Sequence, residues 1–226
     1  MAERTVLDDF PVLLEFDEVR EKLFLHERED IEIVQPLFEE AVRVARPKAV
    51  YRVCHVAGIE GDCVNVGGFT FESAVMAKNL EGVQRVFAYV VTCGVEVDDW
   101  SRGQGDYFVG LWLDMIKEMI LKDTMIRFSD MICGKYDIER FATMNPGSGN
   151  ADIWPITQQR LLFDLIGDVE KDVGVRLTAT SLMSPIKSVS GILFPSESGY
   201  VNCALCTREK CPNRKVPYDP SFGSHE

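Results

Sequence analysis

The first ninety residues alternate between helical and extended hydrophobic patterns. Apolar residues recur at helical spacing over 16–26 and 31–45, and Pro47 ends the second of these predicted helices. Ser73 is suited to cap a short helix that reaches Leu80. Between the helices lie short apolar runs rich in β-branched residues. These runs predict strands over 50–56, 63–66 and 86–92.

The strongest helical pattern runs from Asp106 to Ile132. Asp106 is a residue type that caps helices, and Glu118–Lys122 and Asp123–Arg127 are favourable (i, i+4) charge pairs. Such a long helix usually belongs to the core of a domain. The apolar stripe expected to face that core consists of Phe108, Leu111, Trp112, Met115, Met119 and Ile120.

Beyond Gly134 a loop leads into a predicted helix over 157–167. Strand-like runs follow at 175–181, 188–194 and 200–203. The elements show no regular βαβ alternation, so we expect an α+β fold with a mostly antiparallel sheet and flanking helices. We expect one domain over 1–226, with a short N-terminal helical segment at about 1–46 and a loose C-terminal tail at about 214–226.

Charge and composition exclude several classes of protein. The 226 residues include 46% apolar residues, which is enough for a sizeable core, and the net charge is −12. That charge argues against binding to nucleic acid or to an anionic membrane surface. No apolar run is long enough to span a bilayer, and the N-terminus lacks a signal-peptide layout. We therefore expect a cytoplasmic protein.

The sequence offers no recognisable acid–base or covalent catalyst. None of the three histidines (His26, His55 and His225) lies in a nucleophile motif, and there is no phosphate-binding loop. The acidic pairs 39–40 and 98–99 are interpreted as solvated helix faces. We predict no catalytic residue.

Small residues gather in the loop Asn145–Pro146–Gly147–Ser148–Gly149. Several backbone amides are presented there with little side-chain bulk, because glycine permits positive φ and close approach. The loop is therefore a candidate cradle for a carboxylate or for the sulfonium-bearing chain of a nucleoside. The alternative is an ordinary connection into the helix that follows Trp154.

Three of the seven cysteines, Cys203, Cys206 and Cys211, lie close together near the C-terminus. Their Cys-x2-Cys-x4-Cys-Pro spacing is compatible with an iron–sulfur cluster or a zinc ion, because a two-residue gap lets two thiolates face one metal. A fourth ligand is not obvious, and the candidates are Cys93, Cys133 and Asp219. The alternative is a set of reduced thiols in a turn rich in basic residues.

Several motifs follow one another in the C-terminal half. They are Pro146-Gly147, the helix at 158–167, Gly174-Val-Arg-Leu-Thr, Ser184-Pro185, Ser188-Val-Ser-Gly191 and the aromatic residue after Ser198. In this order, between Phe141 and Tyr200, the chain resembles the activation domain of cobalamin-dependent methionine synthase, in the form of stand-alone homologues. The run Val91-Thr-Cys-Gly94 also looks like a strand end of those homologues.

The resemblance implies a role in cobalamin chemistry. Such a domain binds S-adenosylmethionine in a shallow groove and docks over the corrin of a corrinoid-binding protein or methyltransferase. There, inactive Co(II) is reduced by an external electron donor and trapped by methyl transfer. Positioning is the main task, which agrees with the missing catalysts. The ligand-binding residues implied for this chain are Asn145, Pro146, Gly147, Ser148, Gly149, Ser190, Gly191 and Tyr200.

Two positions depart from the family's pattern. Thr143 stands where the family commonly has an arginine that pairs with the ligand carboxylate, and Ser148 stands where it commonly has an aromatic residue. Loss of the charged contact is expected to weaken binding by roughly a hundredfold. A docking module that does not use S-adenosylmethionine is therefore an alternative, and a redox or structural module built on the cysteines is another.

Overall fold

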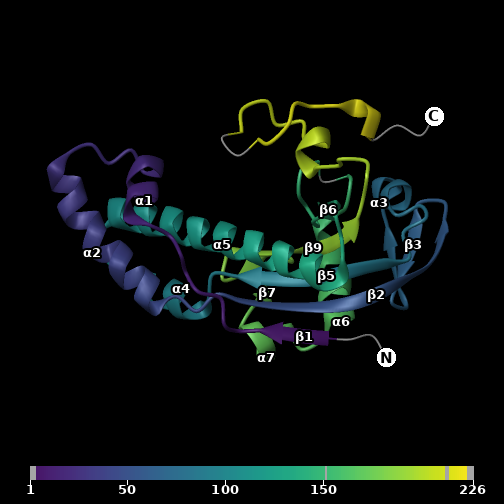
Figure 1. Cartoon of the computed structure of the whole chain (residues 1–226), viewed down its shortest axis with the longest axis horizontal. Helices are drawn as coiled ribbons and strands as arrows, with labels where there is room; N and C mark the ends of the chain where they lie inside the picture. The colour runs from purple at the N-terminus through teal and green to yellow at the C-terminus, as the bar shows by residue number, and fades with distance from the viewer. Residues whose placement is uncertain (1–3, 151, 212–213, 223–226) are drawn as a thin grey trace.

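An antiparallel sheet of seven strands forms the centre of the molecule (Figure 1). The computed structural model describes residues 4–150, 152–211 and 214–222. The strand order is β4-β3-β2-β5-β9-β6, and β1 also pairs with β2. The strands are β1 Arg4–Leu7, β2 Lys48–Glu60, β3 Cys63–Val66, β4 Phe69–Glu72, β5 Arg85–Thr92, β6 Phe141–Met144 and β9 Ser188–Pro195. A separate two-stranded sheet pairs β7 Arg176–Leu177 with β8 Met183–Ser184.

Helices cover both faces of the main sheet. The long helix α5 packs on one face, while α3, α6 and α7 pack on the other. Helix α2 and α4 pack against the first half of α5, and α1, α2 and that half extend beyond the sheet (Figure 1). The α+β fold is as predicted. The helices are α1 Phe16–Lys22, α2 Arg28–Val44, α3 Ala74–Asn79, α4 Val95–Ser101, α5 Tyr107–Tyr136, α6 Gln159–Ile166 and α7 Val169–Val173, with 3-10 turns η1 Ile156–Gln158, η2 Asn202–Leu205 and η3 Pro220–Phe222.

Strand β5 lies between two cores, which explains its continuous apolar run. Val86, Ala88 and Val90 face the core shared with α3, α6 and α7. Phe87 and Tyr89 alternate with them and face α5. A strand buried on both faces has no polar side, so its sequence cannot show the alternation of a surface strand.

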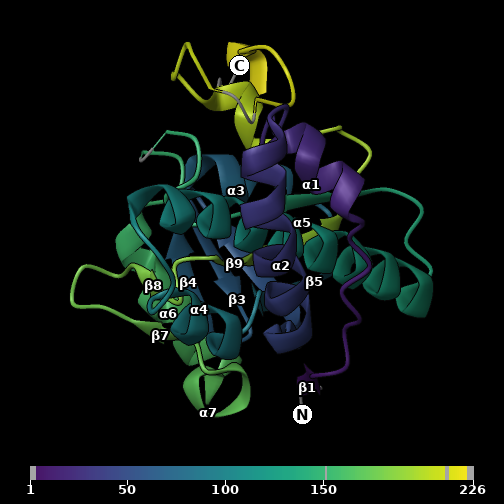
Figure 2. The same ribbon diagram turned by 90° about the vertical axis from the view of Figure 1, so that its left-hand side faces the viewer.

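The described C-terminal residues pack onto the domain. Both views place this segment at the opposite end of the molecule from α7 (Figures 1 and 2). The N–H of Asp219 donates to the carbonyl of Ala204 (2.7 Å), and Lys78 Nζ donates to the carbonyl of Ser221 (3.1 Å). The tail that we expected to be loose from Arg214 is therefore tied down up to Phe222.

Several local expectations were wrong. The N-terminal segment contains helices α1 and α2 where helices were expected, but strand β1, which was not predicted, precedes them. The run 175–181 forms only the two-residue strand β7, and 200–203 leads into η2 instead of a strand. In α5, Phe108 and Leu111 are 65% and 48% exposed, because α5 starts beyond the edge of its core.

The acidic pair at 98–99 is not wholly solvated either. Asp98 is buried in α4, where its Oδ1 accepts from Lys117 Nζ (2.8 Å), which also donates to Ser101 Oγ (2.9 Å). Among the described residues, no helix combines the length and apolar character needed to cross a membrane.

We expect Lys117→Met to lower the free energy of unfolding by about 2–3 kcal/mol, because it leaves Oδ1 of the buried Asp98 carboxylate without this partner while Arg102 still pairs with Oδ2 (2.5 Å). Urea denaturation measures the loss. Lys122→Met, on an exposed position of the same helix, is the control and is expected to change stability by less than about 1 kcal/mol. A double variant, Lys117→Met with Asp98→Leu, should recover part of the loss. Equal effects of the two lysine variants would contradict a buried ion pair.

Candidate functional site

The Asn145 side chain anchors the predicted ligand loop to three other segments. Its Nδ2 donates to the hydroxyl of Tyr89 on β5 (2.9 Å) and to the carbonyl of Ser190 on β9 (2.8 Å). Its Oδ1 accepts from Asn202 Nδ2 in η2 (2.7 Å). An amide can donate and accept at once, so one side chain links β5, β9 and the C-terminal segment to the end of β6.

Gly191 makes this arrangement possible. A Cβ atom at this position would lie 2.3 Å from the carbonyl oxygen of Met144 and 2.5 Å from Asn145 Nδ2. No side chain fits there, because the Asn145 amide occupies the space above the β9 backbone. Glycine is therefore required at position 191, because the Met144 carbonyl and the Asn145 amide approach its Cα too closely for any side chain.

Tyr200 supports the loop from beneath the C-terminal segment. It is only 2% exposed, its hydroxyl donates to Asn202 Oδ1 (3.1 Å), and its ring packs edge-on against Phe222 (5.9 Å between centroids). Burial raises the pKa of its phenol. Ser190 is buried as well, and its Oγ donates to Gln159 Oε1 (3.1 Å). Tyr200 thus supports the loop through Asn202, while Ser190 and Gly191 of β9 lie against the side chain of Asn145.

The accessible part of the loop is its glycine backbone. Gly147 and Gly149 are exposed and adopt φ of 72° and 83°, values that favour glycine. Two loop amides are used internally: Gly147 N–H donates to the Trp154 carbonyl (2.8 Å) and Ser148 N–H to the Asn145 carbonyl (3.1 Å). A ligand would therefore meet mainly the Gly147–Gly149 segment and the Ser148 side chain.

Thr143 lies on the edge strand that leads into the loop. Its neighbours Ala142 and Met144 point into the core beneath α6 and α7. Side chains alternate along a strand, so Thr143 lies on the opposite, α5-facing side of the sheet. It is half-buried, and its Cα pairs with Leu193 of β9. A longer side chain at this position would extend along that side.

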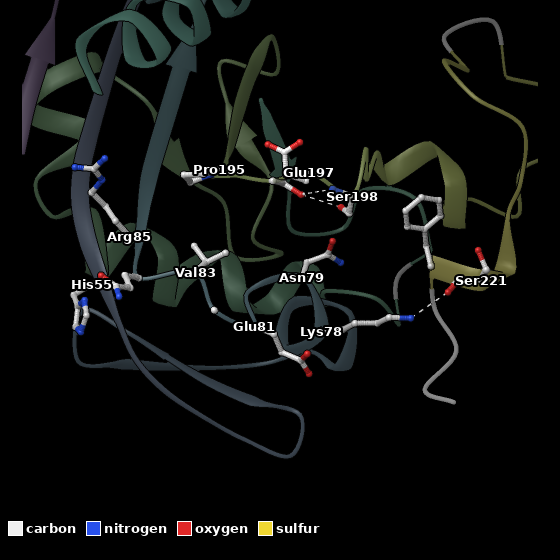
Figure 3. Close-up of a pocket in the computed structure, with 14 residues that line it drawn as sticks. His55, Lys78, Asn79, Glu81, Val83, Arg85, Pro195, Glu197, Ser198 and Ser221 are labelled. Carbon is white, nitrogen blue, oxygen red and sulfur yellow. Dashed lines mark hydrogen bonds between the residues drawn. The ribbon is translucent and has the colours of Figure 1, made fainter. Parts of the chain in front are cut away.

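A polar cleft of about 1090 Å³ opens between the start of β5 and the C-terminal segment (Figure 3). Lys78 reaches across it to Ser221, and Phe222 connects it to the buried ring of Tyr200. Sequence reasoning missed this cleft, because its walls come from segments far apart in the chain. Side chains around it include His55, Asn79, Glu81, Arg85, Glu197 and Ser198.

The cysteines are distributed over separate parts of the fold. Cys203, Cys206 and Cys211 are half-buried in the C-terminal segment, but no group of three Cys, His, Asp or Glu side chains in the described part of the chain is placed to hold a metal ion. Cys93 is buried in the core between α2 and α5, and burial raises its pKa to about 12. Cys133 lies on α5. Of the three fourth ligands considered, only Asp219 lies beside η2.

Comparisons with known proteins show which fold this chain has and which family part of its sequence matches. Residues 120–215 match the family model of the vitamin B12 dependent methionine synthase activation domain. A solved structure titled "Crystal Structure of the MetH Reactivation Domain bound to AdoHcy" aligns with 88% of this chain and 80% of its own, at 17% identity and a TM-score of 0.61. No curated protein sequence matches the chain. The predicted resemblance is thereby confirmed: the chain has the fold of the vitamin B12 dependent methionine synthase activation domain and matches that family over residues 120–215.

Proposed function

We propose that this protein assists the reductive reactivation of a corrinoid protein, with S-adenosylmethionine as methyl donor. It docks over the cobalamin of a separate partner, while an external donor supplies the electron. The observation that supports this best is the loop 145–149, held rigidly at an exposed sheet edge by the Asn145 network. The similar MetH reactivation domain is one that was crystallised with AdoHcy.

The chemistry requires alignment from the protein rather than proton transfer. The methyl group leaves the sulfonium, whose bonding electron pair stays on sulfur, and is taken up by reduced cobalt on the partner. The residues of this chain then have two tasks: to hold the nucleoside, and to hold it in one orientation. Hydrogen bonds from three segments to the side chain of Asn145 restrict the loop's movement, which serves the second task.

A docking module without S-adenosylmethionine is the second candidate. Thr143 offers no positive charge to a ligand carboxylate, and two of the loop amides already donate to backbone carbonyls, those of Trp154 and Asn145. Such a module would keep the fold and the contact with the corrinoid partner while another protein or small molecule supplies the methyl group. Whether this chain binds S-adenosylmethionine separates the two candidates.

We expect S-adenosylmethionine to bind weakly to the wild-type chain and about 10- to 100-fold more tightly to Thr143→Arg. The introduced guanidinium would form a charge-assisted pair with the ligand carboxylate, worth roughly 1.5–3 kcal/mol. Calorimetric titration of the anaerobically purified protein measures both affinities.

Thr143→Gln, of similar length without the charge, is the matched control and should bind like the wild type. An absence of binding up to millimolar ligand in all three proteins would exclude the methyl-donor role. The docking function would then remain, and binding to a corrinoid protein would be measured directly.

A further inference from the structure

The short turn η2 carries Cys203 and Cys206 on the same side of the chain. The N–H of Cys206 donates to the carbonyl of Cys203 (3.2 Å) at the end of the turn. A turn closed by such a bond brings its first and fourth Cα atoms within about 7 Å, and disulfides join Cα atoms about 4.4–6.8 Å apart. Side chains three residues apart in a 3-10 turn also eclipse one another. The backbone thus places the two thiols within reach of one disulfide bond.

The two residues between the cysteines determine which way the thiols face. Ala204 and Leu205 are buried, and Leu205 packs into the core beneath α3, α6 and α7. With three residues per turn, one side of η2 remains for Cys203 and Cys206, and both are half-buried. A small molecule can therefore reach this pair, whereas Cys93 is buried in the core.

Bonds from the following segment hold the turn at both cysteines. The guanidinium of Arg214 donates to the carbonyls of Cys203 (3.1 Å) and Cys206 (3.0 Å). The N–H of Asp219 donates to the carbonyl of Ala204 between them (2.7 Å). The folded chain therefore keeps the two thiols together, whereas an unfolded chain also samples conformations in which they are apart.

We propose that Cys203 and Cys206 are a redox pair, which a small-molecule disulfide oxidises reversibly to an intramolecular disulfide. One thiol loses its proton to solvent, and its thiolate attacks the small disulfide, which releases one thiolate and leaves a mixed disulfide on the protein. The second cysteine, also deprotonated, attacks the mixed disulfide and releases the second small thiolate. Both released thiolates take up protons. Two electrons have then passed from the cysteine pair to the small disulfide, and Cys211 takes no part.

Oxidation of this pair acts on the ligand loop through Asn202. Asn202 directly precedes Cys203 and donates to Asn145 Oδ1 (2.7 Å). A disulfide removes motions of η2 that would break this contact, so the loop opens less often in the oxidised protein. We expect slower hydrogen exchange at the amides of Gly147 and Ser148 after oxidation, because both donate to carbonyls only while the loop is closed. Equal exchange rates in the two redox states would contradict this coupling.

The test equilibrates the full chain with mixtures of reduced and oxidised glutathione under anaerobic conditions, followed by alkylation and mass spectrometry. Tryptic cleavage after Arg208 and Lys210 separates Cys211 from the pair. We expect the peptide that contains Cys203 and Cys206 to lose two hydrogens in one transition, while Cys211 remains open to alkylation. The equilibrium constant should be about 10-fold larger for the folded chain than for the urea-unfolded chain, because folding holds the thiols together.

Variants separate the pair from its surroundings. Cys203→Ser and Cys206→Ser should each abolish the transition, whereas Cys211→Ser should retain it. Arg214→Met should remove most of the folded chain's preference for the disulfide, because it deletes the bonds to both carbonyls. Arg208→Met, at an exposed position of the same segment, is the matched control and should keep that preference. The melting temperatures of the reduced proteins show whether each variant folds.

Three results would each overturn the proposal: a disulfide to Cys211, glutathione adducts without an internal disulfide, or equal equilibrium constants in the folded and unfolded chains. Visible absorption of an iron–sulfur cluster in the protein as purified, lost in the serine variants, would also overturn it, because the thiols would then be occupied. None of these measurements involves S-adenosylmethionine or a corrinoid, so they are independent of the proposed function.

Discussion

Asn145→Ala is expected to lower the free energy of unfolding by about 3 kcal/mol and to abolish measurable binding of S-adenosylmethionine. The substitution leaves the hydroxyl of Tyr89, which is 1% exposed, and the carbonyl of Ser190 without this donor, and it removes the acceptor of Asn202. Each unsatisfied buried group costs roughly 1–3 kcal/mol. Denaturant unfolding measures the stability, and calorimetry at a temperature where the variant remains folded measures the binding.

Asn65→Ala is the matched control for this substitution. Asn65 also bonds through its side chain, to the N–H of Gly68 (3.2 Å), but in a solvent-exposed turn. Water can replace that bond, so the expected loss is below about 1 kcal/mol, with unchanged ligand binding. Similar losses for both asparagine variants would show that the network around Asn145 is not specially important.

Gly191→Ala is expected to be more damaging, costing about 3 kcal/mol or more or preventing folding. The new Cβ would lie 2.3 Å from the backbone oxygen of Met144, which cannot move without separating β6 from β9, and 2.5 Å from Asn145 Nδ2. Overpacking of this kind forces shifts of the main chain. Thermal unfolding and expression level report the effect.

Gly58→Ala provides the comparison, since Gly58 is also in a strand and a Cβ atom at this position would have no neighbour within 4 Å. It should change stability by less than about 1 kcal/mol. If Gly191→Ala folds, its loss should not add fully to that of Asn145→Ala, because both disturb one network. Full additivity of the two losses in the free energy of unfolding would show that Asn145 and Gly191 do not belong to one network.

The sequence predicted the elements that have long, regular patterns. Strands β5 and β9 and helix α5, with its cap at Asp106, lie close to their expected bounds. Strands β1 and β6 have only four residues each, too few for a periodicity to be recognised. Strand β3 is as short but was predicted, because glycines on both sides mark its bounds, and neither β1 nor β6 is bracketed in this way. The exposure of Phe108 could not be predicted either, because an apolar stripe does not show where its partner surface ends.

The sequence pointed to the loop 145–149 and to Gly191 as the candidate site, but it did not predict the side chains that hold the loop in place. The glycines of the loop and Gly191 identified a place of close backbone approach. Tyr89 and Asn202, which hold the loop through Asn145, come from segments more than fifty residues away and have no local signature. The resemblance placed Tyr200 beside a ligand, whereas the structure buries it, because a matching position does not specify what covers it.

The position of β9 between β5 and β6 determines when the site can form during synthesis. Strand β6 is made before β9 but has its sheet partner only in β9. The Asn145 network then needs Asn202, which is made later still. A growing chain can fold β2 to β5 through neighbouring pairings, but the loop 145–149 has no support from η2 until Asn202 has left the ribosome. A nascent chain that has not yet reached Asn202 would therefore lack the assembled loop.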